Sequence, residues 1–402
     1  MMLSYLSKTP GIGGTLKSKA EDFIVEEIGN DGAVLELDKP FVRTDEDGGQ
    51  FVHFVLQKKN WSTSSALLEI AKRLHMSQRH FNLAGTKDKT AISTQLASGF
   101  GISKEALLSL KIKDIQINGA WMAKDKVRLG RLLGNRFTIR IEDVGSVDDR
   151  ETSERVKKIY SELHGRFPNY FGEQRFGSTR RNTHLIGQKL LQNDCEGAVR
   201  IFLCDVEGEK NNESMEARKE LASTNDYARA LQYFPKHLRL ERTMLAYLEK
   251  KKDYVGALKR LPRNILLLFV HAFQSHLFNE LLSGRIKESG GELELEKGEY
   301  FCGETLGFPD LGKMEAEGWI AGKLIGYGTP LNERELALLE KMGISKDAFR
   351  LKLLPEVASK GTYRTLLAPL KDFGFSESVF RFSLPSGCYA TMAMREFLDK
   401  KD

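Results

Sequence analysis

The stretch FNLAGTKDKTAISTQ, residues 81–95, places a single carboxylate, Asp88, between two lysines in a turn that leads into a β-patterned run. Gly85 allows a backbone conformation that other residues avoid, or the close approach of a ligand. If the residues around Asp88 are extended, Lys87 and Lys89 point to the face opposite the carboxylate. The two lysines would then hold phosphates while Asp88, the candidate catalytic residue, enters a pocket.

Two nucleotide-binding motifs are excluded at this turn. The stretch lacks the GxxxxGK(S/T) spacing of a phosphate-binding loop. Its aspartate directly follows Lys87, which differs from the (N/T)KxD pattern that reads guanine. A lysine–aspartate pair in a glycine turn is also typical of a plain solvated turn, so the local pattern leaves both interpretations open.

Composition places the chain among ordinary globular proteins of two or three domains, with 402 residues, 41% of them hydrophobic and 29% charged. The four cysteines form no CxxC and the eight histidines no HExxH, so neither a metal site nor a disulfide framework is expected. The longest apolar run, from Ile265 to Val270 and on to Phe273, is too short to span a bilayer. With no secretory signal pattern either, we expect a cytoplasmic protein without a membrane partner.

The positive charge is concentrated in one segment. The whole chain carries a formal +6, and residues 111–140 alone contain eight basic and two acidic side chains, which is also +6. Trp121 and Phe137 lie within this segment. A local basic field with interleaved aromatic rings is the pattern expected for binding RNA or DNA, although a solvated strand face gives the same pattern.

The first 168 residues mix strand and helix signals. Residues 22–37 resemble a hairpin with a turn at Asn30-Asp31-Gly32, and residues 62–74 predict a helix capped by Ser62 or Thr63. The remaining expected elements are strands at 51–57, 92–97, 115–122 and 137–141, a short helix near 106 and a helix from about 148 to 163. This order favours an α+β fold with a largely antiparallel sheet and helices on one face.

The next two hundred residues are richer in helix. Residues 262–282 predict a helix that begins with a proline in its first turn and ends at Ser283-Gly284. Strand signals return only at VFRFSL, residues 379–384, before a turn and a helix through Phe397. A strand so late in the chain indicates that the C-terminus rejoins the first sheet, which makes the middle an insertion.

Four further segments carry candidate binding residues. In LGNRFTIRI, residues 133–141, the amide of Asn135 can read a base edge and Phe137 can stack on the base, although a turn asparagine and a core phenylalanine are the plainer interpretation. In NYFGEQRFG, residues 169–177, Arg175 is a candidate partner for a phosphate or carboxylate, at a hinge or in a packed aromatic corner.

The other two segments lie near the chain ends. In SLPSGCYATMAMREF, residues 383–397, Tyr389 is expected at a helix N-terminus with its ring available for stacking, while the methionines and Phe397 pack in the core. In LKSKAEDFIVEE, residues 16–27, Lys17, Phe23 and Glu26 are of interest. Strand alternation puts Phe23 on the face opposite Glu26, and a core position is its default.

Together these segments resemble the TruD family of tRNA pseudouridine synthases. The stretches that carry the resemblance are KSKAEDFIVEE, FNLAGTKDKTAISTQ, LGNRFTIR, PNYFGEQRFG and LPSGCYATMAMREF, in the family's order from Lys17 to Phe397. The resemblance implies a pseudouridine-synthase catalytic domain with a mixed, largely antiparallel sheet flanked by helices, in residues 1–168 and 367–402. It also implies that a mainly helical α/β insertion, the TRUD domain, occupies residues 169–366.

The resemblance also implies an activity and a set of site residues. The activity is isomerisation of a uridine in tRNA, at position 13 in the D arm, to pseudouridine. Asp88 falls on the catalytic aspartate, and Lys17 on a position near it. Contacts to the target base or nucleoside are implied for Phe23, Asn135, Phe137 and Tyr389, and Tyr389 departs from relatives that have phenylalanine there.

This chemistry fits the residues available. The reaction has no redox or phosphoryl step, so no cofactor and no metal are expected, and one carboxylate can act as nucleophile or as base. The expected partner is tRNA, with other RNAs open and no obligate protein partner indicated. The alternative is a non-catalytic tRNA-binding or chaperone protein with the same fold, which would gain nothing from a carboxylate among phosphates.

Overall fold

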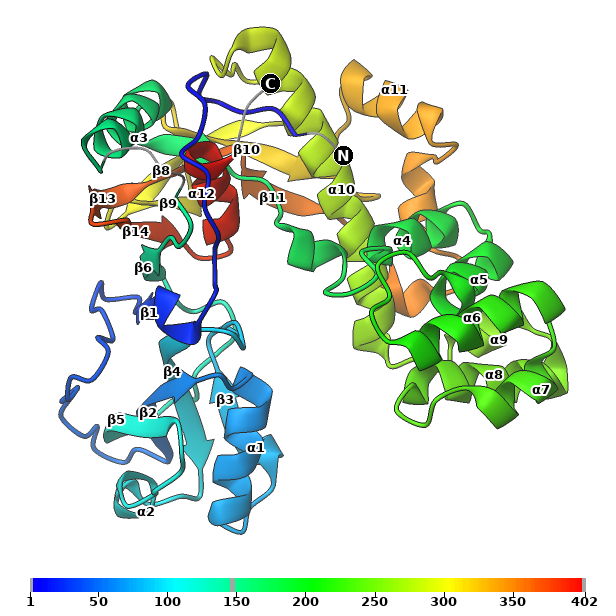
Figure 1. Cartoon of the computed structure of the whole chain (residues 1–402), viewed down its shortest axis with the longest axis horizontal. Coiled ribbons are helices and arrows are strands. Elements are labelled where there is room, and N and C mark those ends of the chain that lie inside the picture. The colour runs from blue at the N-terminus through cyan, green and yellow to red at the C-terminus, as the bar shows by residue number, and fades with distance from the viewer. Residues whose placement is uncertain (1–2, 145–148, 400–402) are drawn as a thin grey trace. The chain divides into compact units, whose positions relative to one another are not determined.

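The computed structural model describes residues 3–144 and 149–399, which divide into two compact units (Figure 1). The sheet unit consists of Leu6–Asn169, Glu304–Asp310 and the chain from Leu367 onward. The helical unit consists of the residues before Leu6, Tyr170–Gly303 and Leu311–Leu366. Relative to the division expected from the sequence, residues 3–5 lie with the helical unit and Glu304–Asp310 with the sheet unit.

An eight-stranded sheet organises the sheet unit, in the order β13-β14-β6-β1-β4-β2-β5 with β3 paired to β4. Its strands are β1 (Phe23–Ile28), β2 (Phe51–Lys59), β3 (Phe81–Leu83), β4 (Ile92–Phe100), β5 (Ile115–Ala123), β6 (Gly134–Arg140), β13 (Lys371–Ser376) and β14 (Val379–Pro385). Among the described pairings of this sheet, β1 with β4 is parallel and the others are antiparallel. The prediction of a mixed, largely antiparallel sheet is confirmed.

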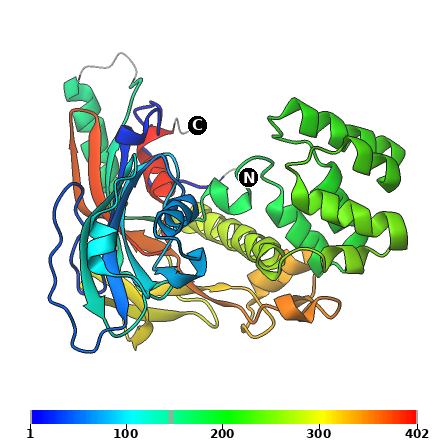
Figure 2. The ribbon, with the colours of Figure 1, turned by 90° about the horizontal axis from the view of Figure 1, so that it is seen from below.

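Helices cover one face of this sheet. They are α1 (Thr63–Arg73), α3 (Asp149–Leu163) and α12 (Ala390–Leu398), and Figures 1 and 2 show α1 and α12 on the same side. Strand register explains this, because Val25 of β1 is paired with Ser93 of β4, and Ser93 with Lys58 of β2, so these side chains share a face. Apolar neighbours on that face pack against α1 in one cluster and against α3 and α12 in another.

The sheet unit also contains several smaller elements. They are the helix α2 (Lys104–Leu108), the 3-10 turns η1 (Ala20–Asp22) and η2 (Gln78–His80), and a two-stranded sheet of β7 (Arg166–Pro168) with β12 (Leu367–Pro369). The predicted helix α1 is confirmed, with Ser62 as the cap that accepts a hydrogen bond from the Ser65 N–H. Of the helix expected from about residue 148, Asp148 lies outside the described residues.

The predicted hairpin at residues 22–37 is wrong in its second arm. Both edges of β1 are already occupied, by β4 and by β6, so residues 33–37 cannot pair along it. A single bridge joins Ile28 to Val34. The chain then leaves the sheet, and Leu35 packs against Val55 and Trp121 on the face opposite α1.

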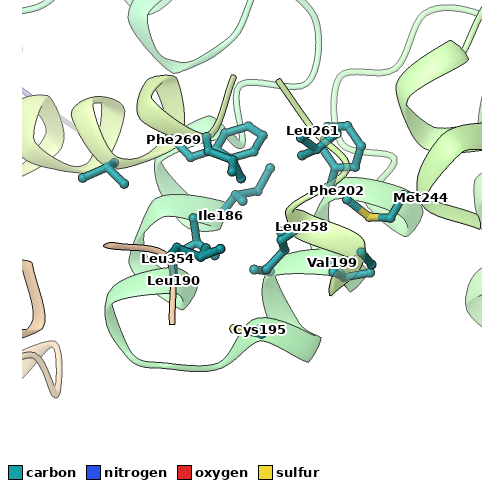
Figure 3. Close-up of a cluster of buried hydrophobic side chains, with 14 of the residues drawn as sticks. Ile186, Leu190, Cys195, Val199, Phe202, Met244, Leu258, Leu261, Phe269 and Leu354 are labelled. Carbon is teal, nitrogen blue, oxygen red and sulfur yellow. The ribbon is translucent and has the colours of Figure 1, made fainter. Parts of the chain in front are cut away.

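The helical unit is built from helices around one apolar core. Its helices are α4 (Thr183–Leu191), α5 (Cys195–Cys204), α6 (Asn212–Thr224), α7 (Tyr227–Tyr233), α8 (Arg239–Lys251), α9 (Tyr254–Leu258), α10 (Arg263–Ser289) and α11 (Glu333–Lys341), with 3-10 turns η3 (Glu173–Phe176), η4 (Lys346–Arg350) and η5 (Pro355–Val357). Ile186 of α4, Phe202 of α5, Met244 of α8 and Phe269 of α10 meet in its core (Figure 3).

Helix α10 is longer than predicted. Pro262 is its N-cap, and the helix continues through Ser283-Gly284 to Ser289. Gly290 is its C-cap and adopts a left-handed conformation. An interior glycine costs about 1 kcal/mol, and the packing of Ile286 together with the Arg285–Glu299 ion pair at 2.6 Å holds the extra turns. Among the described residues, α10 is the one helix that is long and apolar enough to cross a membrane. However, 61% of its most apolar 18-residue stretch is buried inside the structure, as is typical of a core helix.

In sequence order, a four-stranded sheet lies between α10 and the C-terminal strands. The α/β insertion implied by the resemblance allows for such a sheet, but the local sequence patterns did not predict its strands. Its order is β11-β10-β8-β9, formed by β8 (Tyr300–Thr305), β9 (Phe308–Glu315), β10 (Trp319–Leu324) and β11 (Thr362–Thr365). The expectation that strand signals return only at residue 379 is therefore wrong. These strands contain Gly303, Pro309 and Gly322, residues that normally indicate a break in a strand pattern.

Candidate active site

The loop between β3 and β4, residues 84–91, is held by side chains that are buried in the sheet unit. Thr63 Oγ1, at the first position of α1, accepts a hydrogen bond from the Lys87 N–H at 3.0 Å and donates one to Gln95 Oε1 at 2.9 Å. Gln95 Nε2 in turn donates to the Gly85 carbonyl at 3.0 Å. The turn that carries Asp88 is therefore a fixed part of the unit and is not a plain solvated turn.

The Lys87 side chain anchors this loop from below. Its ammonium lies 2.7 Å from Glu27 Oε2, and the two side chains are only 6% and 1% exposed. The other oxygen of Glu27 accepts a hydrogen bond from the Leu96 N–H at 3.1 Å. The expectation that Lys87 binds substrate phosphates is wrong for this structure, because its charge is consumed by a buried carboxylate. Lys89, by contrast, is exposed.

The Asp88 carboxylate reaches solvent, since one third of the side chain is exposed. Lys17 donates a hydrogen bond from its ammonium to Asp88 Oδ2, and the same nitrogen lies 4.1 Å from the centroid of the Phe23 ring. The Lys17 backbone has a φ of 62°, an uncommon conformation for a lysine. Asp88 is thus brought together with Lys17 and Phe23, which come from a separate segment near the N-terminus.

A buried lysine that sequence reasoning missed holds the backbone of Asp88. Lys58 Nζ donates a hydrogen bond to the Asp88 carbonyl oxygen at 2.8 Å, and the Lys58 residue is inaccessible to solvent. Burial lowers the pKa of Lys58 to about 8, while the negative charge of Asp88 acts in the opposite direction. At neutral pH this position adds a positive charge directly behind the candidate catalytic residue.

The depressed pKa of Lys58 predicts a pH-dependent stability. Between about pH 8 and the ordinary lysine value of 10.5, the unfolded chain binds more protons than the folded one. The free energy of unfolding should therefore rise with pH across this window, by up to about 1.4 kcal/mol per pH unit, and this stabilisation is lost again as the pH falls toward 8. Urea unfolding of wild type and Lys58→Met from pH 7 to 10 measures this dependence. We expect the difference in unfolding free energy, wild type minus variant, to grow as the pH rises, and a constant difference would contradict the assignment.

Strand register aligns the other candidate residues on the sheet face that carries α1, below the Asp88 loop. Asn135 of β6 lies directly opposite Glu27 of β1, and Phe137 lies opposite Val25. The Asn135 side chain is half-buried, and its Oδ1 is buried without a hydrogen-bond donor among the described residues. A buried amide oxygen without a donor is uncommon in a native protein, and ligand binding is one explanation for it.

Phe23 and Phe137 are core residues here. They are 2% and 6% exposed, their ring centroids are 6.0 Å apart in an edge-to-face arrangement, and Phe137 also lies 5.6 Å from Phe382. Phe23 occupies the core position that strand alternation favoured, and the Lys17 ammonium lies over its ring. In this structure neither ring presents a free face for a base to stack on.

Among the three aromatic residues expected to contact the base, Tyr389 is half-buried, whereas Phe23 and Phe137 are buried. It is the N-cap residue of α12, which follows the turn after β14, and Leu384 of β14 lies directly opposite Asn135. The Ser386 N–H donates to the Leu133 carbonyl at 2.8 Å, which ties this turn to the start of β6. Tyr389 is therefore only a few residues from the strand pair that carries Asn135.

Arg175 belongs to the helical unit, and its surroundings are described there. Its Nε donates a hydrogen bond to Ser275 Oγ of α10 at 3.0 Å, and its guanidinium lies 5.6 Å from the centroid of the Phe171 ring. The structure thus supports the packed aromatic corner expected as the alternative. Its role toward a phosphate stays a prediction.

Glu27 and Lys58 escaped sequence reasoning although the sequence contains a signal for both. Each continues an apolar alternation at its end, Glu27 after Phe23 and Val25, and Lys58 after Phe54 and Leu56. An ionisable residue in the buried register of a strand requires a charged or hydrogen-bonding partner. Here both partners lie in the Asp88 loop.

Comparison with known proteins decides the family. A family model described as tRNA pseudouridine synthase D (TruD) matches residues 1–397. The chain belongs to the TruD family. Two probable tRNA pseudouridine synthases D, from Thermococcus sibiricus and Thermococcus onnurineus, are 36% and 38% identical to it, over 98% of this chain and 97% of each relative.

A solved structure of the family agrees with this assignment. The crystal structure described as a putative tRNA pseudouridine synthase D (TruD) from Methanosarcina mazei is 31% identical. The structural match covers 98% of this TruD-family chain and 95% of the Methanosarcina mazei chain, with a TM-score of 0.77. The α+β fold expected from the resemblance is therefore confirmed across the chain.

Proposed function

We propose that this TruD-family chain isomerises a uridine of tRNA, expected at position 13 of the D arm, to pseudouridine, with Asp88 as the catalytic residue. The relatives named as probable tRNA pseudouridine synthases support the reaction and the substrate class. The observation that carries the role of Asp88 is its setting. An accessible carboxylate stands on a loop whose backbone and neighbouring side chain are held by buried polar groups.

The proposed chemistry needs one well-positioned carboxylate. The N1–C1′ glycosidic bond of the uridine breaks, the uracil turns, and a C5–C1′ bond forms, while the C5 proton is lost and N1 gains one. Asp88 either attacks the sugar or base as a nucleophile, or removes the 2′ proton as a base. Both routes need the carboxylate held at the target nucleoside, and a rigid loop removes the entropic cost of ordering it at each turnover.

Asn135 is the proposed contact to the uracil edge. Uracil presents an N3–H donor, and Asn135 Oδ1 is a buried acceptor without a donor among the described residues. Phe23 and Phe137 support this site from the core, and Tyr389 supplies the more accessible aromatic ring. The target must leave its stack to arrive here, at a cost of about a few kcal/mol.

This assignment predicts a separation of activity from stability at Asn135. Asn135→Ala should lower kcat/KM by about 10- to 100-fold, since a base-edge hydrogen bond contributes ~1–3 kcal/mol of discrimination. Its unfolding midpoint should change little, because the Oδ1 atom accepts no hydrogen bond from the described part of the chain. Turnover assays and urea unfolding of the same preparations measure both. A large loss of stability with unchanged kcat/KM would point to a structural role instead.

The activity itself is tested with tRNA transcripts. Purified protein is incubated with each transcript, and pseudouridine is mapped by chemical modification and primer extension. We expect product at uridine 13 of the D arm. Product at another tRNA position would keep the enzyme class and replace the target. Tight tRNA binding without product at any position would favour a non-catalytic tRNA-binding protein.

A further inference from the structure

An exposed leucine stands at the tip of the loop between β5 and β6. Leu129 is 78% exposed, among the most exposed large apolar side chains of the described chain. It occupies the second position of a β-turn closed by a 3.1 Å hydrogen bond from the Arg131 N–H to the Arg128 carbonyl. Gly130, the third residue, has a φ of 82°, which a type II turn requires there. The turn therefore holds Leu129 outward in a defined position.

The same loop is fastened to the Asp88 loop. The Gly130 N–H donates a hydrogen bond to the Ala84 carbonyl at 2.7 Å, and the buried Val127 and Leu132 on either side of the turn pack against Ala84. Ala84 begins the segment that leads to Asp88. Four residues span at most about 14 Å, so the turn that carries Leu129 is attached at Ala84, whose Cα atom lies no more than about 14 Å from that of Asp88.

Exposed basic side chains surround Leu129. Arg128 and Arg131 flank it in the turn, and Lys124 and Lys126 precede it, all of them exposed. The one acid in this stretch, Asp125, lies 3.7 Å from Arg128 in a pair exposed on both sides. By contrast Arg136, in the same basic segment of the sequence, is engaged by Glu26 and Glu36. Of the exposed basic side chains in residues 111–140, four therefore lie within the eight residues around this apolar tip, and Lys111, Lys113 and Arg140 lie elsewhere in the segment.

We infer that Leu129 is a wedge that enters the RNA base stack beside the target uridine, with Arg128 and Arg131 on the adjacent phosphates. This inference rests on the proposed function, since it describes how a stacked uridine reaches Asp88. A single exposed leucine alone has no special meaning. Here a rigid turn, flanking guanidinium groups and attachment to the Asp88 loop occur together. Apolar side chains that enter a base step replace the stacking lost when a nucleotide leaves the helix, and guanidinium groups suit phosphates.

The inference is tested first without turnover. A tRNA transcript carries 2-aminopurine beside the target uridine, and its fluorescence rises when the base unstacks. In an Asp88→Asn background, binding should raise the fluorescence, and adding Leu129→Ala should abolish most of that rise at saturating protein. Leu129→Phe, which keeps a wedge, should retain it. Leu108→Ala removes another exposed leucine of the sheet unit, 52% exposed in α2, and should behave like the parent.

Turnover provides the second measurement. Leu129→Ala should lower kcat by about tenfold on folded tRNA but change it little on a short unstructured RNA with the same target, because that RNA has no stack to open. Replacing Arg128 and Arg131 by serine should weaken binding and reduce the slope of log affinity against log salt by about one unit per arginine.

The outcomes separate the wedge from the proposed function. An unchanged fluorescence rise in Leu129→Ala overturns the wedge, as does an equal loss of kcat on folded and unstructured RNA. If the wild-type protein forms no pseudouridine on either RNA, the proposed function fails, and the fluorescence measurement still decides whether Leu129 unstacks the neighbouring base.

Discussion

Asp88→Asn is expected to bind tRNA with nearly wild-type affinity and to form pseudouridine at least about 10³-fold more slowly. An amide has the shape of the carboxylate and can still accept the hydrogen bond from Lys17. It is a poor nucleophile and does not take up a proton at neutral pH. The backbone contacts of the loop, to Lys58 and to Thr63, do not involve the carboxylate and should remain.

Single-turnover assays and filter binding measure the two quantities on one preparation. Asp114→Asn is the matched control, because it makes the same change at an exposed aspartate of the same unit. Asp114 has a φ of 62°, a conformation that asparagine adopts readily. Product formation by Asp88→Asn within a few fold of wild type would remove Asp88 from the chemistry. An equal loss in both variants would indicate a general effect on folding.

Lys87→Met is expected to destabilise the sheet unit by about 3–5 kcal/mol, because it leaves the Glu27 carboxylate buried without its charge partner. Both side chains of this pair are almost completely inaccessible. Adding Glu27→Gln should recover most of the loss, since the amide is neutral and its oxygen can still accept the Leu96 N–H. The double variant should nevertheless show a reduced kcat, because the anchor of the Asp88 loop is gone.

Urea unfolding, followed by tryptophan fluorescence, measures the stability of each variant. Lys39→Met is the matched control, since Lys39 pairs with Glu36 at 2.7 Å in an exposed setting and should cost less than about 1 kcal/mol. Similar small losses in Lys87→Met and Lys39→Met would contradict the burial of the pair. A double variant that is stable and fully active would show that the pair serves stability and does not position Asp88.

Much of the architecture follows from local patterns. The alternation in β2 and the apolar stripe with its serine cap in α1 predicted those elements close to their observed bounds. Where local patterns failed, a distant partner decided the outcome. Residues 33–37 have a strand-like composition, but β4 and β6 already occupy both edges of β1. The four-stranded sheet of β8 to β11 was missed because glycine and proline interrupt its strands.

The candidate site likewise has features that local patterns predicted and features that distant partners decided. Its residue types and their order along the chain were sufficient for the family, and Asp88 was recognised from its own segment. The roles of the lysines were not predictable, because Lys87 and Lys89 look equivalent in the sequence, yet one pairs with a buried carboxylate sixty positions away and the other is exposed. Lys58 likewise contacts the Asp88 backbone thirty positions along.

The sequence by itself therefore determined the family, the largely antiparallel α+β sheet and the identity of the candidate carboxylate. These depend on periodicity and on motifs in which each residue is judged with its neighbours in the chain. Only the tertiary structure decided which basic side chains are neutralised by a buried carboxylate and which remain exposed to bind RNA. Register across β6, β1, β4 and β2 aligns Asn135, Glu27 and Lys58 under one loop. Burial then pairs Lys87 with Glu27 and leaves Arg128 and Arg131 at the surface, because a charged group that is removed from water needs an opposite charge or a hydrogen-bonding partner.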